Sequence, residues 1–183
     1  MNKLALALAA TGALALGVPT APATASLETY EARAAASGAA AIARDDMIEL
    51  FGKDSLKPGK YVWRDVPESA GEERVIISLD NQLAFLYRGN SLVGVASVAT
   101  GREGHPTPPG IFMVLEKKTM HRSRKYDNAP MPFMQRIDRF GIALHAGHNP
   151  GHPASHGCIR LPSEFAKKLF AVTEVGTPVF IGA

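Results

Sequence analysis

Apolar side chains recur with a period of two through residues 75–79 and 83–87, a third run follows at 92–100, and this pattern constrains the fold more than any other feature. Two short turn sequences, Asp80-Asn81 and Arg88-Gly89-Asn90, separate the three runs. Alternation of this kind predicts β-strands, and tight turns between consecutive runs predict antiparallel pairing. The chain is therefore expected to fold around an antiparallel meander.

The rest of this half of the chain fits the same fold class. Pro162 is expected to open a helix, because Phe165, Leu169 and Val172 follow at helical spacing. Further strands are predicted at 111–117, 131–137, 141–145 and 179–181, with a Gly/Pro-rich loop at 101–110. Residues 74–183 should thus form one mainly β domain with one clear helix.

Residues 26–73 have a different composition and are predicted to form an Ala-rich helical spacer or linker. Alanine favours helix, and Ser37-Gly38 is expected to interrupt it. Its apolar positions, such as Met47 and Phe51, could dock on a domain or lie free. Turns on either side of Tyr61–Trp63 precede the β domain.

Residues 1–25 have the pattern of a signal peptide. Lys3 precedes an apolar stretch from Leu4 to Val18, and Ala23-Thr24-Ala25 fits a cleavage site before Ser26. An uncleaved membrane anchor is the alternative, but 15 apolar residues fall short of the roughly 20 that span a bilayer. We expect the protein to be exported to the periplasm or the cell wall.

Composition excludes several classes of function. Without residues 1–25 the chain has 19 basic and 17 acidic residues, a net charge of +2. This charge is too small to indicate a nucleic-acid partner. The one cysteine, Cys158, excludes an intramolecular disulfide scaffold and a zinc finger with two or more cysteines.

Four of the six histidines and the only cysteine fall within the 14 residues from His145 to Cys158. A nearby imidazole can take the thiol proton and leave a thiolate–imidazolium pair, which is a strong nucleophile. His145, at the end of an apolar strand, is better placed as the base than His148 or His152 in the loop. Gly157 lets a substrate approach the backbone, so the amides of Gly157 and Cys158 could bind an oxyanion.

A zinc site is the second chemistry open to this cluster. His145, His148, His152, His156 and Cys158 are all possible ligands. Prolines and glycines between them, however, break any helix that would align these side chains. We therefore expect no metal and no organic cofactor, and a buried, inert cysteine fits the polar surroundings less well than either chemistry.

Residues 155–161, Ser-His-Gly-Cys-Ile-Arg-Leu, resemble the signature of the L,D-transpeptidase catalytic domain, also called the YkuD domain. Upstream, Ala99-Thr100-Gly101 and the segment 107–112 are similar to the family's "TG…TPxGxF" motif, and the segments 131–133 and 141–145 resemble its approach to the catalytic histidine. The interval from His145 to Ser155 is shorter than is usual in the family, which leaves His148 as an alternative base.

The resemblance implies a mainly β catalytic domain, a mixed β-sandwich or barrel-like fold with one or two helices, and a cysteine-dependent acyltransferase. It makes Cys158 the nucleophile and His145 the general base and acid, with the ring oriented by the Ala146 carbonyl. Gly157 would supply an oxyanion amide, while Ser155 and His156 would shape the substrate site. Arg160 would hold a carboxylate of the substrate, which a guanidinium can do bidentately.

The substrate that the resemblance implies is a peptidoglycan tetrapeptide stem, transferred through an acyl-enzyme to an amine acceptor. That acceptor could be a second stem, giving a 3→3 cross-link, or an exported protein. Transfer to water would make the protein an L,D-carboxypeptidase. A zinc-dependent peptidase and a non-catalytic cell-wall-binding domain are weaker alternatives. Inhibition by carbapenems is expected.

Overall fold

The computed structural model describes residues 26–183. The signal peptide predicted at residues 1–25 lies outside the described residues. Among those described, no helix is both long enough and apolar enough to cross a membrane.

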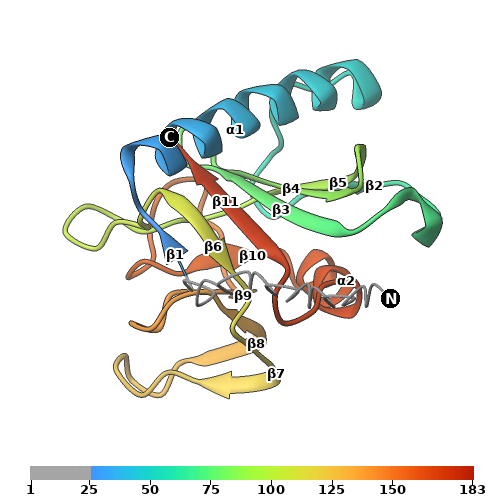
Figure 1. Ribbon diagram of the computed structural model, residues 1–183. Coiled ribbons are helices and arrows are strands. Elements are labelled where there is room, and N and C mark those ends of the chain that lie inside the picture. Colours follow the sequence, from blue (N-terminus) through green and yellow to red (C-terminus); the bar gives the residue numbers. More distant parts are fainter. Residues whose placement is uncertain (1–25) are drawn as a thin grey trace, which may run out of the picture.

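Two helices, one short 3₁₀ turn and eleven strands make up the described chain (Figure 1). The helices are α1 (Tyr30–Phe51) and α2 (Ser163–Val172), and the 3₁₀ turn is Glu68–Ala70. The strands are β1 (Ser26–Leu27), β2 (Tyr61–Trp63), β3 (Glu73–Ser78), β4 (Leu83–Arg88), β5 (Ser91–Ser97), β6 (Gly110–Met113), β7 (Glu116–Arg122), β8 (Pro130–Arg136), β9 (Ala143–Ala146), β10 (Ile159–Leu161) and β11 (Pro178–Gly182).

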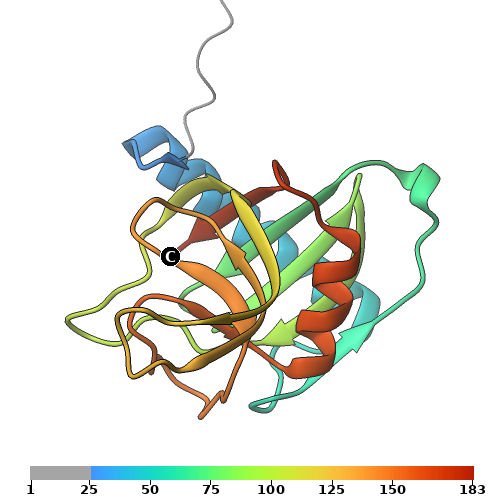
Figure 2. The same cartoon turned by 90° about the horizontal axis from the view of Figure 1, so that it is seen from below.

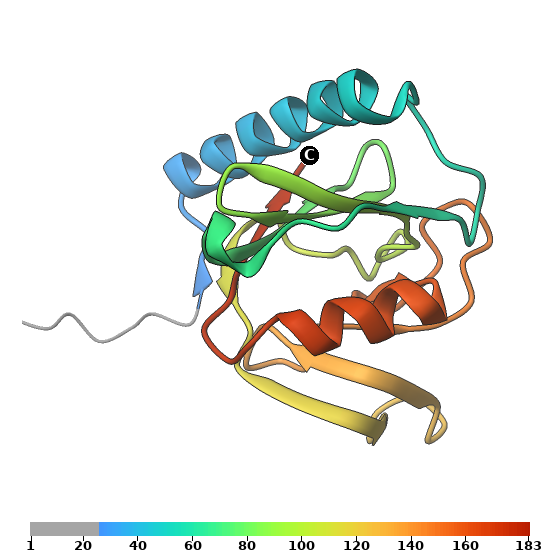
Figure 3. The same cartoon turned by 90° about the vertical axis from the view of Figure 1, so that its right-hand side faces the viewer.

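The strands form two mixed sheets. The larger has seven strands in the order β1-β6-β11-β3-β4-β5-β2, and the smaller has four in the order β10-β9-β8-β7. The pairs β11–β3 and β10–β9 are parallel, and the other strand pairs of both sheets are antiparallel. Helix α1 lies over the larger sheet, whereas the smaller sheet and α2 lie beneath it (Figure 3). The mainly β class and the antiparallel meander β3-β4-β5 are thereby confirmed.

Both faces of the large sheet are buried. Ile76, Phe85 and Val95 pack with Ala43 and Met47 of α1. On the opposite face, a larger core joins the large sheet to β9, β10 and α2; its members include Val75, Ile77, Leu86, Leu144, Ile159, Phe165 and Leu169. Because α1 covers one face and the smaller sheet the other, the strands carry apolar side chains at consecutive positions.

Helix α1 runs unbroken from Tyr30 to Phe51, so the predicted interruption at Ser37-Gly38 is wrong. A glycine inside a helix costs only about 1 kcal/mol relative to alanine. Burial of an alanine stripe along the helix offsets that cost, and the stripe ends at Met47. The helix docks on the sheet rather than lying free, and it reaches so close to β11 that a Cβ on Gly182 would lie 2.6 Å from the Ala36 carbonyl oxygen.

The other differences from the expected elements concern short or polar strands. The strand expected at 111–117 is two strands, β6 and β7, which belong to different sheets. Strands β1 and β10 were not expected. Strand β2, within the predicted linker, forms an edge of the large sheet by pairing with β5.

Candidate active site

The site forms where β9 and β10 run side by side in the smaller sheet. Their parallel register pairs Arg160 with His145, and Cys158 immediately precedes β10. Residues that are paired across a ladder share a face, and the same face recurs at every second residue. Cys158 packs with Ala143, two residues before His145, so the thiol and the imidazole lie on one side of the sheet.

A backbone hydrogen bond fixes the tautomer of His145. Its Nδ1 lies 2.8 Å from the carbonyl oxygen of Ala146. Since a carbonyl can only accept, Nδ1 carries the proton, and the neutral ring has its lone pair on Nε2. The side chain is only 7% exposed. Burial lowers the pKa of His145, and the charges of Arg160 and His121 lower it further, against the raising effect of the Ala146 hydrogen bond.

The Cys158 thiol is partly buried against Met131, Met134 and Ala143. Its Sγ donates to the Gly141 carbonyl oxygen at 3.7 Å. Burial raises the pKa of Cys158, while a hydrogen bond from the Ala143 backbone and the charge of Arg160 act in the opposite direction. Burial thus favours a neutral thiol beside a neutral imidazole at rest, over the thiolate–imidazolium pair expected from the sequence.

The turn before Cys158 is held by the Ser155 hydroxyl. The Gly157 amide donates to Ser155 Oγ at 3.0 Å, and that hydroxyl donates to the Cys158 carbonyl oxygen at 2.5 Å. Gly157 has a φ of +111°, and a Cβ there would lie 2.4 Å from Ile142 Cδ1. Glycine is therefore required, and its amide can reach an oxyanion only by giving up its bond to Ser155.

The Thr-Gly and Thr-Pro-Pro-Gly segment meets the Ser-His-Gly-Cys turn here, although the two lie about 50 residues apart in the sequence. Thr107 Oγ1 donates to the Gly157 carbonyl oxygen at 2.7 Å and accepts from the Gly101 amide at 2.8 Å. The amides of Ala154 and Ser155 both donate to the Thr100 carbonyl oxygen. The Thr-Gly and Thr-Pro-Pro-Gly segments thus form the support on which the cysteine turn rests.

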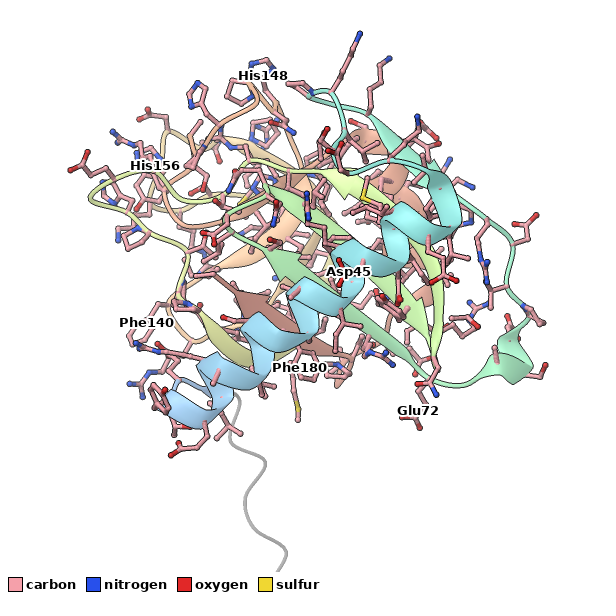
Figure 4. The ribbon with its side chains drawn as sticks, turned by 90° about the horizontal axis from the view of Figure 1, so that it is seen from above. Asp45, Glu72, Phe140, His148, His156 and Phe180 are labelled. Carbon is pink, nitrogen blue, oxygen red and sulfur yellow. The ribbon has the colours of Figure 1, made fainter. Side chains whose placement is uncertain are left out.

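His156 is partly exposed, and Figure 4 shows it at the edge of the molecule. Its ring stacks on Tyr126 at 4.1 Å and meets His105 edge-on at 4.8 Å. Its Nε2 lies 2.9 Å from the guanidinium of Arg102, which can only donate. Desolvation lowers the pKa of His156, and the charges of Arg102, His105, Arg160 and Lys125 lower it further.

His148 and His152 are exposed in the 147–153 loop. His152 Nδ1 is 3.0 Å from the Pro153 carbonyl oxygen, and Figure 4 shows His148 well apart from His156. Within residues 26–183, no group of three His, Cys, Asp or Glu side chains is close enough to hold a metal ion. The absence of a metal from the chemistry stays a prediction.

His121 is a neighbour of the site that the sequence did not reveal. It lies on β7 opposite Met131, which contacts the cluster around Cys158, and its charge acts on His145. Met131 and Met134 share this cluster although they are three residues apart, because Phe133 between them has a φ of +55°. Such a left-handed residue breaks the alternation of a strand, and it leaves no signal in the sequence.

A family model described as the L,D-transpeptidase catalytic domain (YkuD) matches residues 72–181, which are 110 of the 183 residues. The chain belongs to this family. Members of the L,D-transpeptidase family are also its structural neighbours. The L,D-transpeptidase of Stackebrandtia nassauensis is 24% identical with a TM-score of 0.58, over 74% of this chain and 64% of that one.

Two further neighbours have the same fold. Residues 123–326 of an L,D-transpeptidase from Xylanimonas cellulosilytica are 27% identical, with a TM-score of 0.55, over 65% of this chain and 64% of that one. An L,D-transpeptidase in complex with imipenem is 19% identical, with a TM-score of 0.55, over 60% and 58% of the two chains. This chain covers less than two thirds of the length of each of these structures. A search of the curated proteins finds no significant match.

Of the residues expected at the site, the L,D-transpeptidase fold brings together Cys158, His145, Ala146 and Arg160 on the β9–β10 pair and the turn before it. Ser155 and Gly157 brace that turn. His156 lies at its outer rim, with neighbours from two other segments.

Proposed function

We propose that this protein is a peptidoglycan L,D-transpeptidase that forms an acyl-enzyme at Cys158 and passes the acyl group to an amine. The observation that carries the proposal is the placement of Cys158 and His145 on one side of the β9–β10 pair, with the Ala146 carbonyl fixing the His145 tautomer. A base with its lone pair on Nε2 therefore lies on the same side of the sheet as the thiol.

In the first half of the proposed reaction, His145 Nε2 takes the proton of the Cys158 thiol as the sulfur attacks the carbonyl carbon at position three of the tetrapeptide stem. The Cys158 amide stabilises the oxyanion that forms, a contribution of about 3 kcal/mol for one donor. The Gly157 amide joins it if its bond to Ser155 is exchanged. The intermediate collapses, His145 returns the proton to the departing amine of the terminal D-amino acid, and a thioester remains.

In the second half, the amine of an acceptor attacks the thioester carbonyl and loses a proton to His145. The carbon–sulfur bond breaks, and the thiolate regains its proton from the His145 imidazolium. A second stem as acceptor gives a 3→3 cross-link, an exported protein gives an anchored protein, and water gives a carboxypeptidase product. We propose that the protein acts after export, where the stems are located.

Arg160 supports the proposal in two ways. Its positive charge lowers the pKa of Cys158, which stabilises the thiolate as it forms. Among residues 26–183 the ion pairs are Arg88–Glu73, Lys118–Glu116 and Arg136–Glu116, so the Arg160 guanidinium has no carboxylate partner. We propose that it binds a carboxylate of the donor stem.

The proposed nucleophile can be tested by intact-mass spectrometry after incubation with imipenem. A related L,D-transpeptidase has been solved with this carbapenem. We expect one covalent adduct on the wild-type protein and none on Cys158→Ala. An adduct of equal yield on Cys158→Ala, or no adduct on the folded wild type, would contradict the assignment.

A further inference from the structure

Basic side chains from three segments gather around His156. Arg102 and His105 come from the loop between β5 and β6, Lys125 comes from the turn of the β7–β8 hairpin, and Arg160 from β10. The loop, the hairpin turn and the segment before β10 lie on one side of the molecule (Figure 2). The charged groups that act on the His156 ring are all basic.

Two hydrogen bonds hold Arg102 in place. Its amide donates to the Ser155 carbonyl oxygen, and its guanidinium donates to His156 Nε2 at 2.9 Å. A guanidinium has five N–H donors, so several stay available after this bond. His156 in turn is packed between Tyr126 and His105. The guanidinium is therefore positioned by both backbone and ring contacts.

The hairpin turn places Lys125 in a similar way. The amides of Lys125 and Tyr126 both donate to Ser123 Oγ, and the Lys125 ammonium lies 5.5 Å from the centre of the Tyr126 ring. Stacking of Tyr126 on His156 joins this turn to the rim of the site. In residues 26–183, neither Arg102 nor Lys125 forms a salt bridge.

We propose that Arg102 and Lys125, joined through the stacked rings of His156 and Tyr126, form an anion subsite that binds a carboxylate of a peptidoglycan stem. This subsite rests on the proposed function for the identity of its ligand, and it is separate from the carboxylate held by Arg160. The protein as a whole is almost neutral, so unpaired cations beside the nucleophile turn favour an anionic ligand there. The carboxylate can belong to the donor stem or to the acceptor stem.

The first test measures binding without turnover. In a Cys158→Ala background, isothermal titration compares a stem tetrapeptide with the same peptide whose carboxylates are amidated. We expect Arg102→Gln and Lys125→Gln each to weaken binding of the acid by about threefold, and both together by about tenfold, because exposed charge pairs contribute modestly. Binding of the amidated peptide should not change, and added salt should reduce the contrast.

Arg124→Gln is the matched control. It removes the same charge from the same hairpin turn, but Arg124 is not among the groups that act on His156. The proposal is overturned if the Arg102→Gln and Lys125→Gln variants bind the acid as tightly as Arg124→Gln does, or if the amidated peptide loses affinity equally.

The second test separates the two sources of carboxylate. If Arg102→Gln and Lys125→Gln need more tetrapeptide for acylation, the subsite binds the carboxylate of the donor stem. If they need more acceptor to resolve a preformed acyl-enzyme, the subsite binds the carboxylate of the acceptor stem. If neither concentration rises, the proposed subsite is contradicted. Imipenem adduct formation by each variant shows that the nucleophile is intact. If the wild type forms no adduct, the proposed function fails. The difference in binding between the acid and the amidated peptide still shows whether the subsite exists.

Discussion

At the scale of single residues, the environments of His145 and Cys158 favour proton transfer during the attack rather than before it. Burial disfavours both charged forms, so it lowers the pKa of the imidazole and raises that of the thiol. A neutral pair of this kind needs a base that is unprotonated near neutral pH. The lowered pKa of His145 provides one.

This arrangement predicts the pH dependence of the reaction. The base must be neutral, and its pKa is lowered, so the acid limb of kcat/KM should lie below the ordinary histidine value of about 6.5. Alkylation by iodoacetamide requires the thiolate, so its rate should rise only above the ordinary thiol value of about 8.5. Stopped-flow acylation and alkylation rates between pH 5 and 10 check both limbs. An alkylation midpoint near pH 6 would instead show a thiolate at rest.

His145 and His148 are the two candidates for the general base, and replacing each of them gives a matched pair of variants. His145→Gln should lower kcat/KM by about 10²- to 10⁴-fold, because it removes the general base. His148→Ala should stay within about twofold of the wild type, since His148 is exposed in a loop. Circular dichroism controls for folding. The assignment is wrong if His148→Ala abolishes turnover and His145→Gln spares it.

The residues proposed to carry the chemistry could be singled out from the sequence, but the long-range contacts that hold the site could not. The single cysteine among histidines and the resemblance to a family signature indicate Cys158 and His145. Nothing local predicts that Thr107 bonds to Gly157, because the bond joins positions 50 residues apart. His121 is equally hidden, because it comes near the site only through the pairing of β7 with β8.

At the scale of elements, the close approach of α1 to β11 predicts opposite effects at two glycines. A Cβ on Gly38 would meet no atom within 4 Å, so Gly38→Ala should stabilise the helix by about 0.5–1 kcal/mol. A Cβ on Gly182 would meet the Ala36 carbonyl oxygen at 2.6 Å, so Gly182→Ala should destabilise the protein by about 1–3 kcal/mol.

Thermal unfolding measures this contrast, and each kcal/mol corresponds to about 2–4 °C in Tm for a chain of this size. Both variants exchange glycine for alanine, so each is the control for the other. A fall in Tm for Gly38→Ala would show that the helix is interrupted at Ser37-Gly38, as the sequence suggested.

Elements with strong periodicity were predictable, and short or polar ones were not. The meander from β3 to β5 and helix α2 follow from local pattern and turn residues. Strand β10 has three residues, and its partners β9 and Ala99 lie elsewhere in the chain, so it has no local signal. Strand β7 is Glu-Lys-Lys-Thr-Met-His-Arg, whose mostly exposed side chains give no alternation.

At the scale of the whole molecule, the large sheet is a platform with a helix on one face and the site-bearing sheet on the other (Figures 1 and 3). The segment 26–73 contributes to this platform, because α1 covers one face and β2 extends one edge. The proposed site thereby lies on short strands and turns that a large buried core supports.

The measurement that tests the central proposal most directly is incubation of the purified protein with defined tetrapeptide muropeptides, followed by mass spectrometry of the products. We predict release of the terminal D-amino acid and formation of a 3→3 linked dimer by the wild type, and neither product with Cys158→Ala. Release of the terminal residue without any dimer would identify a carboxypeptidase. Unchanged muropeptides with the folded wild type, or the same products from Cys158→Ala, would contradict a cysteine transpeptidase.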